Sequence, residues 1–372
     1  MDLALAQITD RVRAAAADHT PLRIRGGGTK DFVGRAREGE VLDTRTLHGI
    51  VSYEPSELVV TVRAGTPLAE LEATLAAQGQ YLPFEPPHFP RAGADGATVG
   101  GMVAAGLSGP ARASVGAVRD FILGTQVLNG RAELLVFGGQ VMKNVAGYDV
   151  SRLMAGAWGT LGLITEVSLK VLPVAPGEAT LRFECNQADA MRKLHAWGGQ
   201  PLPLNASCWV EDSGVGTLYV RLRGAMAAVE AACKSMGGER MDSAAVRADW
   251  AACREQTLPW FAARAADHGL WRLSVPATAP VLALPAAAQP LVEWHGALRW
   301  VQAPLAAGDA LRAAARAAGG SAMLFAAPKA YEASPTGQFD LESKPLEQIH
   351  TRVKQSFDPA GIFNRGRLSP HW

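Results

Sequence analysis

The chain has 372 residues, of which 48% are hydrophobic and 19% are charged, and its formal net charge is +1. This length allows two domains or one large one, and the composition is that of a soluble globular protein. A net charge so close to zero excludes the overall electrostatic signature of a nucleic-acid or anionic-membrane binder.

The N-terminus is predicted to be a helix rather than a targeting segment. Residues 1–17 contain charged side chains at Asp2, Asp10, Arg11 and Arg13, which a signal peptide would not carry in its apolar region. Apolar runs elsewhere are shorter than the roughly 20 residues needed to cross a bilayer. We therefore expect a cytoplasmic protein, with peripheral attachment to the inner face of the plasma membrane as the alternative.

Strands and helices alternate through the first half of the chain. Residues 22–25 and 58–63 are predicted strands, the second because of its β-branched side chains. A helix follows, with Thr66 as its N-cap, Pro67 at its first position and Gly79 at its end. Asn129-Gly130, between two apolar runs, predicts a β-hairpin with a two-residue type I′ turn.

Three separated glycine-rich segments are the most informative motifs: residues 25–30 (RGGGTK), 98–101 (TVGG) and 156–162 (GAWGTLG). Consecutive glycines can present backbone N–H groups to a phosphate, and Lys30 can neutralise its charge. Neither the Walker pattern nor G-x-G-x-x-G is present. Any one segment is explained by a tight turn, but three on one β-rich scaffold predict a long ligand held along its length.

After Pro173 the pattern changes to that of a second α+β domain. Residues 174–177 form a predicted linker, followed by strands at 179–184 and 217–223 and helices at 187–197 and 226–236. Residues 291–301 are predicted to be one strand carrying two tryptophans, and a helix is expected to begin near Leu346.

The four cysteines, Cys185, Cys208, Cys233 and Cys253, are widely spaced, which favours buried thiols in a reducing compartment. An iron–sulfur cluster would need a tight cysteine run. If electrons leave this protein through such a cluster, another chain must therefore carry it.

Several motifs together resemble the vanillyl-alcohol-oxidase/PCMH flavoprotein superfamily, and within it the FAD-binding subunits of bacterial glycolate oxidase. These motifs are RIRGGGTK, TVRAGTPLAELEATLAAQGQYLPFEPP, ATVGGMVAAGLSGPARASVGAVRDFILG, EWHGALRW, FDPAGIFNRGRL and above all FGGQVMKNVAGYDVSRLMAGAWGTLGLITEVSLKVLP. The resemblance implies an α+β fold with a PCMH-type FAD-binding domain at residues 1–173. A shortened α+β cap domain would follow at 174–345, and residues 346–372 would return to the flavin domain.

The resemblance also implies which residues contact FAD. Residues 25–30 would surround the pyrophosphate, and the C-terminal Asn would face the isoalloxazine, although Asn364-Arg365-Gly366 replaces the usual Asn-Pro-Gly. Thr29 stands where covalent relatives carry His or Cys, so non-covalent FAD is expected. The full implied set is Arg25, Gly26, Gly27, Gly28, Thr29, Lys30, Thr98, Gly100, Gly101, Ser108, Gly109, Gly116, Asp120, Gly159, Thr160, Gly162, Ile164 and Asn364.

The catalytic residues are not identified by this resemblance. Relatives that oxidise D-2-hydroxy acids carry a Glu-His-Gly motif bearing on metal and substrate, whereas residues 331–344 here contain no His, and no metal site is expected. Oxidation of a 2-hydroxy acid needs a carboxylate anchor and a base. Arg299 as anchor and His295 as base are weak candidates; the alternative places both on a solvent-facing strand.

The expected function is that of one FAD-binding subunit in a complex that oxidises glycolate to glyoxylate. Its expected partners are a second FAD-containing subunit and an iron–sulfur subunit. Two alternatives stay open: a self-sufficient FAD-linked 2-hydroxy acid dehydrogenase, and a non-catalytic flavin-fold scaffold. The tryptophans of the second domain are expected either to fill its core or to anchor partner subunits.

Overall fold

The computed structural model describes residues 3–34, 38–91, 94–139, 148–212, 214–285, 288–328, 338–340 and 344–371. The chain divides into two compact units. The first comprises Met1–Leu107, Ala117–Pro173 and Leu341–Trp372, and the second comprises Ser108–Gly116 and Val174–Asp340. This division differs from the predicted one, because the segment Ser108–Gly116 joins the second unit and the C-terminal return begins before Leu346.

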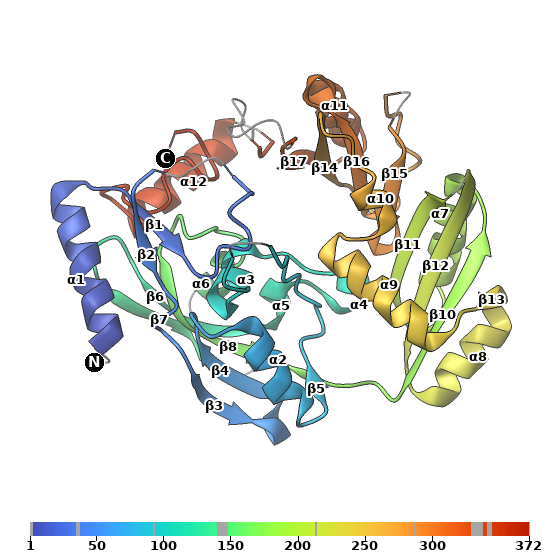
Figure 1. The fold of residues 1–372 in the computed structure, drawn as a ribbon, viewed down its shortest axis with the longest axis horizontal. Helices are drawn as coiled ribbons and strands as arrows, with labels where there is room; N and C mark the ends of the chain where they lie inside the picture. Colours follow the sequence, from blue (N-terminus) through green and yellow to red (C-terminus); the bar gives the residue numbers. More distant parts are fainter. Residues whose placement is uncertain are drawn as a thin grey trace. The chain divides into compact units, whose positions relative to one another are not determined.

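The first unit contains a five-stranded antiparallel sheet in the order β3-β4-β8-β6-β7 (Figure 1). Strands β1 and β2 form a parallel pair, and β5 and β9 an antiparallel pair. The elements are α1 Leu3–Asp18, β1 Leu22–Arg25, β2 Glu40–Asp43, β3 Ile50–Glu54, η1 Pro55–Glu57, β4 Val59–Arg63, α2 Leu68–Ala76, β5 Gln80–Tyr81, α3 Val99–Ala105, α5 Val118–Phe121, β6 Ile122–Leu128, β7 Leu134–Gly138, α6 Val150–Leu153, β8 Leu163–Lys170, β9 Leu172–Pro173 and α12 Lys344–Phe357.

The C-terminal segment pairs with the first strand of the same unit. Leu22 donates its N–H to the carbonyl of Ile362 at 2.7 Å, and Asn364 donates its N–H to the carbonyl of Leu22 at 3.0 Å. Phe363 is buried with Leu22 in a core that the helical face of α1 covers. The return of the chain end to the first unit therefore fixes Asn364 beside β1.

The predicted hairpin of β6 and β7 forms, but its predicted turn is wrong. Leu128 pairs with Leu134, so the connection is longer than two residues. Ala132, rather than Gly130, has a positive φ, of 58°. A Cβ on Gly130 would lie 2.5 Å from Oδ1 of Asp358, so close packing requires this glycine instead of a type I′ turn.

Helix α2 begins one residue later than predicted. Pro67 is the N-cap, and Leu68 is the first helical residue. The hydroxyl of Thr66 accepts a hydrogen bond from the Gly49 N–H at 2.9 Å instead of capping the helix. A tertiary hydrogen bond thus engages the Thr66 side chain, which local propensity assigns to the helix cap.

The second unit contains an eight-stranded antiparallel sheet in the order β13-β10-β12-β11-β15-β16-β14-β17. Its elements are α4 Arg112–Val115, β10 Gly177–Glu184, α7 Gln187–Gly198, β11 Leu204–Asp212, β12 Val215–Gly224, α8 Met226–Met236, β13 Glu239–Arg240, α9 Ser243–Glu255, α10 Pro259–Ala262, β14 His268–Ser274, β15 Pro290–Glu293, η2 Trp294–Gly296, β16 Leu298–Pro304, η3 Leu305–Ala307, α11 Gly308–Ala317 and β17 Ser321–Ala326.

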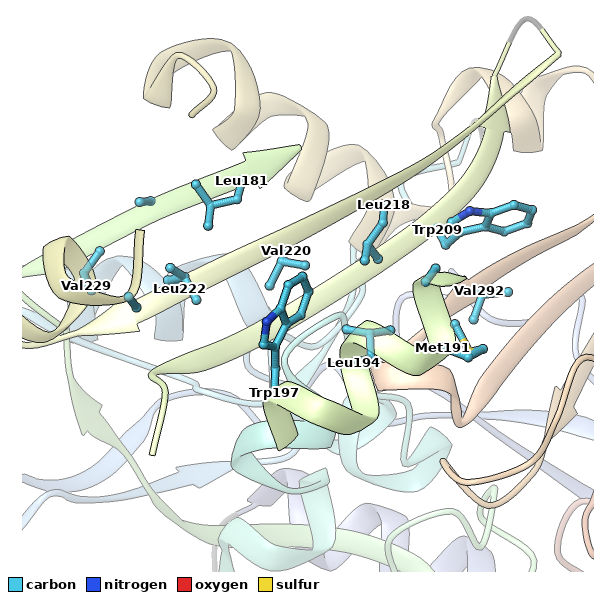
Figure 2. Close-up of a cluster of buried hydrophobic side chains, with 13 residues drawn as sticks. Leu181, Met191, Leu194, Trp197, Trp209, Leu218, Val220, Leu222, Val229 and Val292 are labelled. Carbon is cyan, nitrogen blue, oxygen red and sulfur yellow. The ribbon is translucent and has the colours of Figure 1, made fainter. Parts of the chain in front are cut away.

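One face of this sheet packs against helices to form the hydrophobic core of the second unit. In Figure 2, Leu194 and Trp197 of α7 lie against strand β12, which carries Leu218 and Val220. Side chains alternate along a strand, so the neighbours of these residues point to the opposite face. Helices α7 and α8 lie on the core side at this end of the sheet, and α9 and α10 lie on the other (Figure 1).

The segment predicted as one strand at 291–301 is a hairpin. Strands β15 and β16 pair antiparallel around η2, in which Trp294 and His295 both have φ of 53°. Non-glycine residues rarely adopt this conformation, so periodicity alone does not reveal the turn.

The tryptophans of the second unit belong mainly to its interior. Five of the six expected as core or interface residues are buried within the chain, which is against the interface alternative for them: Trp209, Trp250, Trp271, Trp294 and Trp300.

Candidate functional site

The three glycine-rich segments meet at one pocket of the first unit, together with the C-terminal segment. The predicted residues that line the pocket are Arg25, Gly26, Gly27, Gly28, Thr29, Lys30, Thr98, Gly100, Gly101, Gly159, Gly162, Ile164 and Asn364. Segments far apart in sequence therefore converge as a long ligand would require.

The loop after β1 supplies three consecutive backbone donors. The N–H groups of Gly26, Gly27 and Gly28 donate to no residue that the structure describes. A Cβ on Gly27 would lie 1.5 Å from the carbonyl oxygen of Gly96, so no other residue fits in this packing. Successive free N–H groups of this kind bind anionic oxygens such as those of a pyrophosphate.

Positive charge predominates around these donors. Among the described residues, three cationic side chains, of Arg25, Lys30 and Arg367, line the pocket with one carboxylate, that of Asp31. Asp31 accepts a hydrogen bond from Nε of Arg25 at 2.8 Å, and Nη2 of Arg367 donates to the carbonyl of Lys30 at 3.0 Å. The excess of cations suits a ligand with two or more negative charges.

The second segment forms a wall of the pocket rather than a set of free donors. The hydroxyl of Thr98 caps α3 by accepting from the Gly101 N–H at 3.3 Å. The N–H of Gly100 donates to the carbonyl of Ala64 at 2.7 Å. Gly100 thus joins α3 to β4, while Gly101 leaves space open toward the pocket.

Asn364 links the third segment to β1. Its Oδ1 accepts from the Ile24 N–H at 2.9 Å, and its Nδ2 donates to the carbonyl of Trp158 at 2.7 Å. Gly159 has a φ of 70°, and a Cβ there would lie 2.6 Å from Nδ2 of Asn364. The amide therefore holds both pocket walls together through the backbone.

A buried ion pair supports this arrangement from behind. Nζ of Lys354 donates to Oδ2 of Asp358 at 2.5 Å and to the carbonyls of Thr160 and Phe363 at 2.7 and 3.0 Å. Asp358 accepts from the N–H groups of Ile362 and Phe363 at 3.0 and 2.8 Å. One pair thus joins α12, the third glycine-rich segment and the C-terminal return.

Five predicted residues do not line the pocket. Thr160 is buried, with its hydroxyl donating to the carbonyl of Ala157 at 2.7 Å. Asp120 accepts from the Ala117 N–H at 2.8 Å and caps α5. The other three, Ser108, Gly109 and Gly116, belong to the second unit.

Sequence reasoning missed eight lining residues: Ile24, Asp31, Thr44, Ala64, Ala104, Ala105, Trp158 and Arg367. Arg367 carries a signal that could have been used, since it lies in the same C-terminal motif, FDPAGIFNRGRL, as Asn364. Its guanidinium lies 5.1 Å from the ring centre of Trp158. The small residues carry no such signal, because alanines at these positions are typical of any packed helix or strand.

Neither catalytic candidate is solvent-facing on a strand. Arg299 is fully buried on the core face, where Nη1 donates to the carbonyl of Gly296. Its Nε and Nη2 have no hydrogen-bond partner within the described part of the chain. Burial lowers the pKa of Arg299 to about 10.

His295 lies in the strained turn between β15 and β16. Its Nε2 and Nδ1 contact the hydroxyls of Ser114 and Ser207 at 2.9 and 3.0 Å. On its neighbour Trp294, the guanidiniums of Arg112 and Arg272 lie 4.5 and 5.1 Å from the ring centre. This cationic, strained cluster was not predicted, because the turn itself was read as strand.

Acid is expected to destabilise the second unit through His295. Burial lowers its pKa to about 4, so the folded chain resists protonation where an unfolded chain, with a pKa near 6.5, takes up a proton. Stability should therefore fall by about 2–3 kcal/mol as the pH drops from 6.5 to 4. Denaturant unfolding across this range would show a flatter profile for His295→Asn, because asparagine tolerates positive φ and does not titrate there.

His19 offers a matched control, since it is exposed and also has a positive φ, of 54°. His19→Asn should keep the wild-type pH profile. Identical profiles for His295→Asn and wild type would contradict the assignment to His295.

The region of the expected Glu-His-Gly motif falls largely on residues 331–337 and 341–343, outside the described residues. In the parts of the chain that are described, no three His, Cys, Asp or Glu side chains are grouped to hold a metal. A search of the described helices finds none of the length and apolarity needed to span a bilayer.

Comparisons with known proteins agree with the pocket. Residues 5–138 match the family model described as an FAD binding domain. The fold resembles p-cresol methylhydroxylase with substrate bound, with a TM-score of 0.68 and 12% identity over 99% of this chain and 88% of that one. The chain thus contains an FAD-binding domain, and the predicted α+β fold class and FAD cofactor are confirmed.

The particular family follows from two curated relatives. The chain is 44% identical to glycolate oxidase subunit GlcE of Escherichia coli (strain K12) over 361 residues, which cover 97% of this chain and 96% of that protein. It is 28% identical to glycolate oxidase subunit GlcD of Bacillus subtilis (strain 168) over 183 residues, which cover 48% of this chain and 38% of that protein. The chain belongs to the family of glycolate oxidase subunit GlcE.

Proposed function

We propose that this chain is the FAD-binding subunit of a complex that oxidises glycolate to glyoxylate, together with a second FAD-containing subunit and an iron–sulfur subunit. When bound, FAD would supply the redox chemistry, as a carrier of hydride equivalents and of single electrons. The observation that carries the proposal is the pocket, lined by three glycine-rich segments, in a chain similar over its full length to a glycolate oxidase subunit. Its expected setting is the cytoplasm or the inner face of the plasma membrane.

The residues of this chain have separate tasks in holding the cofactor. We assign the pyrophosphate to the N–H groups of Gly26–Gly28, with Arg25, Lys30 and Arg367 supplying opposite charge. Asn364 keeps the third glycine-rich segment beside β1 through its bonds to Ile24 and Trp158. The buried pair of Lys354 and Asp358 fixes this arrangement, so that the pocket is formed before the ligand arrives.

FAD is expected to be bound without a covalent bond. Thr29 stands in the loop where covalent relatives carry His or Cys, and neither residue type lines the described pocket. Denaturing the purified chain with acid or heat should release all of its flavin into the supernatant, as absorbance would show. Flavin that stays with the precipitated protein would disprove non-covalent attachment.

The isolated chain is expected to oxidise glycolate poorly. A subunit that only relays electrons needs neither a metal nor a substrate anchor, and the sequence lacks the Glu-His-Gly motif between residues 331 and 344. The rate with an artificial electron acceptor should be compared between the isolated chain and the complex purified with its partners. Equal rates would instead favour the self-sufficient dehydrogenase.

The scaffold alternative makes a different prediction. A scaffold would support assembly and activity of the complex whether or not its pocket held FAD. Removing only the flavin, with the subunit still in place, therefore separates the two functions.

A further inference from the structure

The second unit contains a cavity of about 450 Å³ on the sheet face opposite its core. Helices α9 and α10 cover strands β10, β12, β11 and β15 there (Figure 1). On β11, Trp209 points into the core, whereas Cys208 and Val210 line the cavity. Ligand sites in proteins typically have volumes of about 300–1,000 Å³, so the space accommodates a small molecule.

Aromatic and aliphatic side chains form most of the cavity wall. Trp250 of α9 and Trp260, the second residue of α10, line it with Tyr219 of β12. Nε1 of Trp250 donates to the hydroxyl of Thr180 at 3.0 Å, which fixes the orientation of the indole. Flat ring faces held in this way favour a planar aromatic ligand.

Two cysteine thiols, of Cys208 and Cys253, form part of the cavity wall. Sγ of Cys253 donates to Oε1 of the buried Glu293 at 3.1 Å. Its hydrogen bond with Cys208, together with burial, raises the pKa of Cys253 well above the ordinary range. Cys253 is therefore neutral at physiological pH and acts as apolar, polarisable surface.

The charged residues that line the cavity are both acidic. They are Glu211 and Asp249, and no Lys, Arg or His is among the lining residues of the described chain. Asp249 is exposed, whereas Trp250 and Cys253 are buried, so a negative charge lies at the solvent side of an apolar interior. The guanidinium of Arg221 lies 5.0 Å from the ring centre of Trp250, outside the lining, and its Nε donates to Oδ1 of Asn205 at 2.6 Å. The two carboxylates at the solvent side therefore oppose the entry of a small organic acid anion such as glycolate.

We propose that this cavity binds a small planar aromatic molecule that carries no negative charge. The proposal is independent of the flavin pocket and of the glycolate-oxidising complex. Its ligand class follows from the aromatic walls, the apolar interior and the acidic rim.

Two fluorescent probes that share a ring system test the ligand class. N-phenyl-1-naphthylamine is uncharged, and 1-anilinonaphthalene-8-sulfonate adds one negative charge to the same skeleton. Titrated into the full-length chain with its FAD bound, the neutral probe should quench tryptophan emission and bind at least about tenfold more tightly than the sulfonate. Equal affinities, or no saturable binding of the neutral probe, would overturn the proposal.

Substitutions locate the probe and test the role of charge. Ala263→Trp fills the cavity and should abolish binding of the neutral probe, whereas Ala262→Trp places the same indole on a neighbouring residue outside the lining and should not. Val210→Phe repeats the test from the strand side, in case the first variant folds poorly. Wild-type affinity in both filled variants would disprove the location.

The double variant Glu211→Gln, Asp249→Asn should bring the sulfonate's affinity toward that of the neutral probe. Glu230→Gln with Glu239→Gln, which removes two carboxylates outside the lining, should leave the difference unchanged. An unaltered preference in the first double variant would show that the acidic rim does not select the ligand.

Discussion

Replacing Asp358 by alanine is expected to lower the free energy of unfolding by about 3–5 kcal/mol, because it leaves a buried ammonium group without its counter-ion. Lys354 is 3% exposed and Asp358 is 1% exposed. Burial lowers the pKa of Lys354, whereas Asp358 acts to keep it charged. The change also removes the acceptor for the N–H groups of Ile362 and Phe363, so flavin content should fall with stability.

Denaturant unfolding and the ratio of flavin to protein would measure both effects. Asp10→Ala provides the comparison, since Asp10 forms an exposed ion pair with Arg13 and its loss should change stability by less than about 1 kcal/mol. Equal stabilities for the two variants would show that the buried pair does not support the pocket.

Enlarging Gly101 to valine is expected to remove FAD while the chain stays folded. A Cβ at this position meets only Oγ1 of Thr98, at 3.0 Å, and the rest of the side chain would occupy the pocket. Valine is also a better helix former than glycine. The affinity for FAD should fall by more than about tenfold, or 1.4 kcal/mol. The stability of the apoprotein should be retained.

Gly100 is the matched control for this variant. A Cβ there would lie 2.6 Å from Cβ of Ala64 and 3.0 Å from its carbonyl oxygen, so Gly100→Val should destabilise the fold itself. Circular dichroism and flavin absorbance together separate the two outcomes. A folded Gly101→Val chain with wild-type flavin content would place the cofactor elsewhere.

The sequence predicted the residues that line the pocket better than it predicted the local structure around the pocket. Glycines are informative because the positions of Gly27 and Gly159 have no room for a Cβ, so the residue type itself records contacts with Gly96 and Asn364 that are distant in sequence. To predict that Arg367 and Trp158 line the pocket requires knowledge of how segments distant in sequence come together. The resemblance places Asn364 against the isoalloxazine, which stays a prediction; in the structure its amide joins Ile24 to Trp158 through their backbone groups.

Tertiary contacts explain the errors in local structure. Thr66 does not cap the helix, because its hydroxyl accepts a hydrogen bond from the Gly49 N–H. The sequence places Gly130 in a type I′ turn, whereas glycine is required there because Asp358, far along the chain, leaves no room for a side chain. The hairpin at Trp294 and His295 was hidden because bulky residues adopt a conformation that sequence patterns assign to glycine or asparagine.

The most direct test of the electron-relay function uses the complex assembled with the Gly101→Val subunit. Size-exclusion chromatography should show that the complex forms, and flavin analysis should show that only this subunit has lost its FAD. Glycolate oxidation with the physiological acceptor should then be lost. Wild-type turnover by a complex whose subunit lacks FAD would contradict the relay and show that the chain acts as a scaffold.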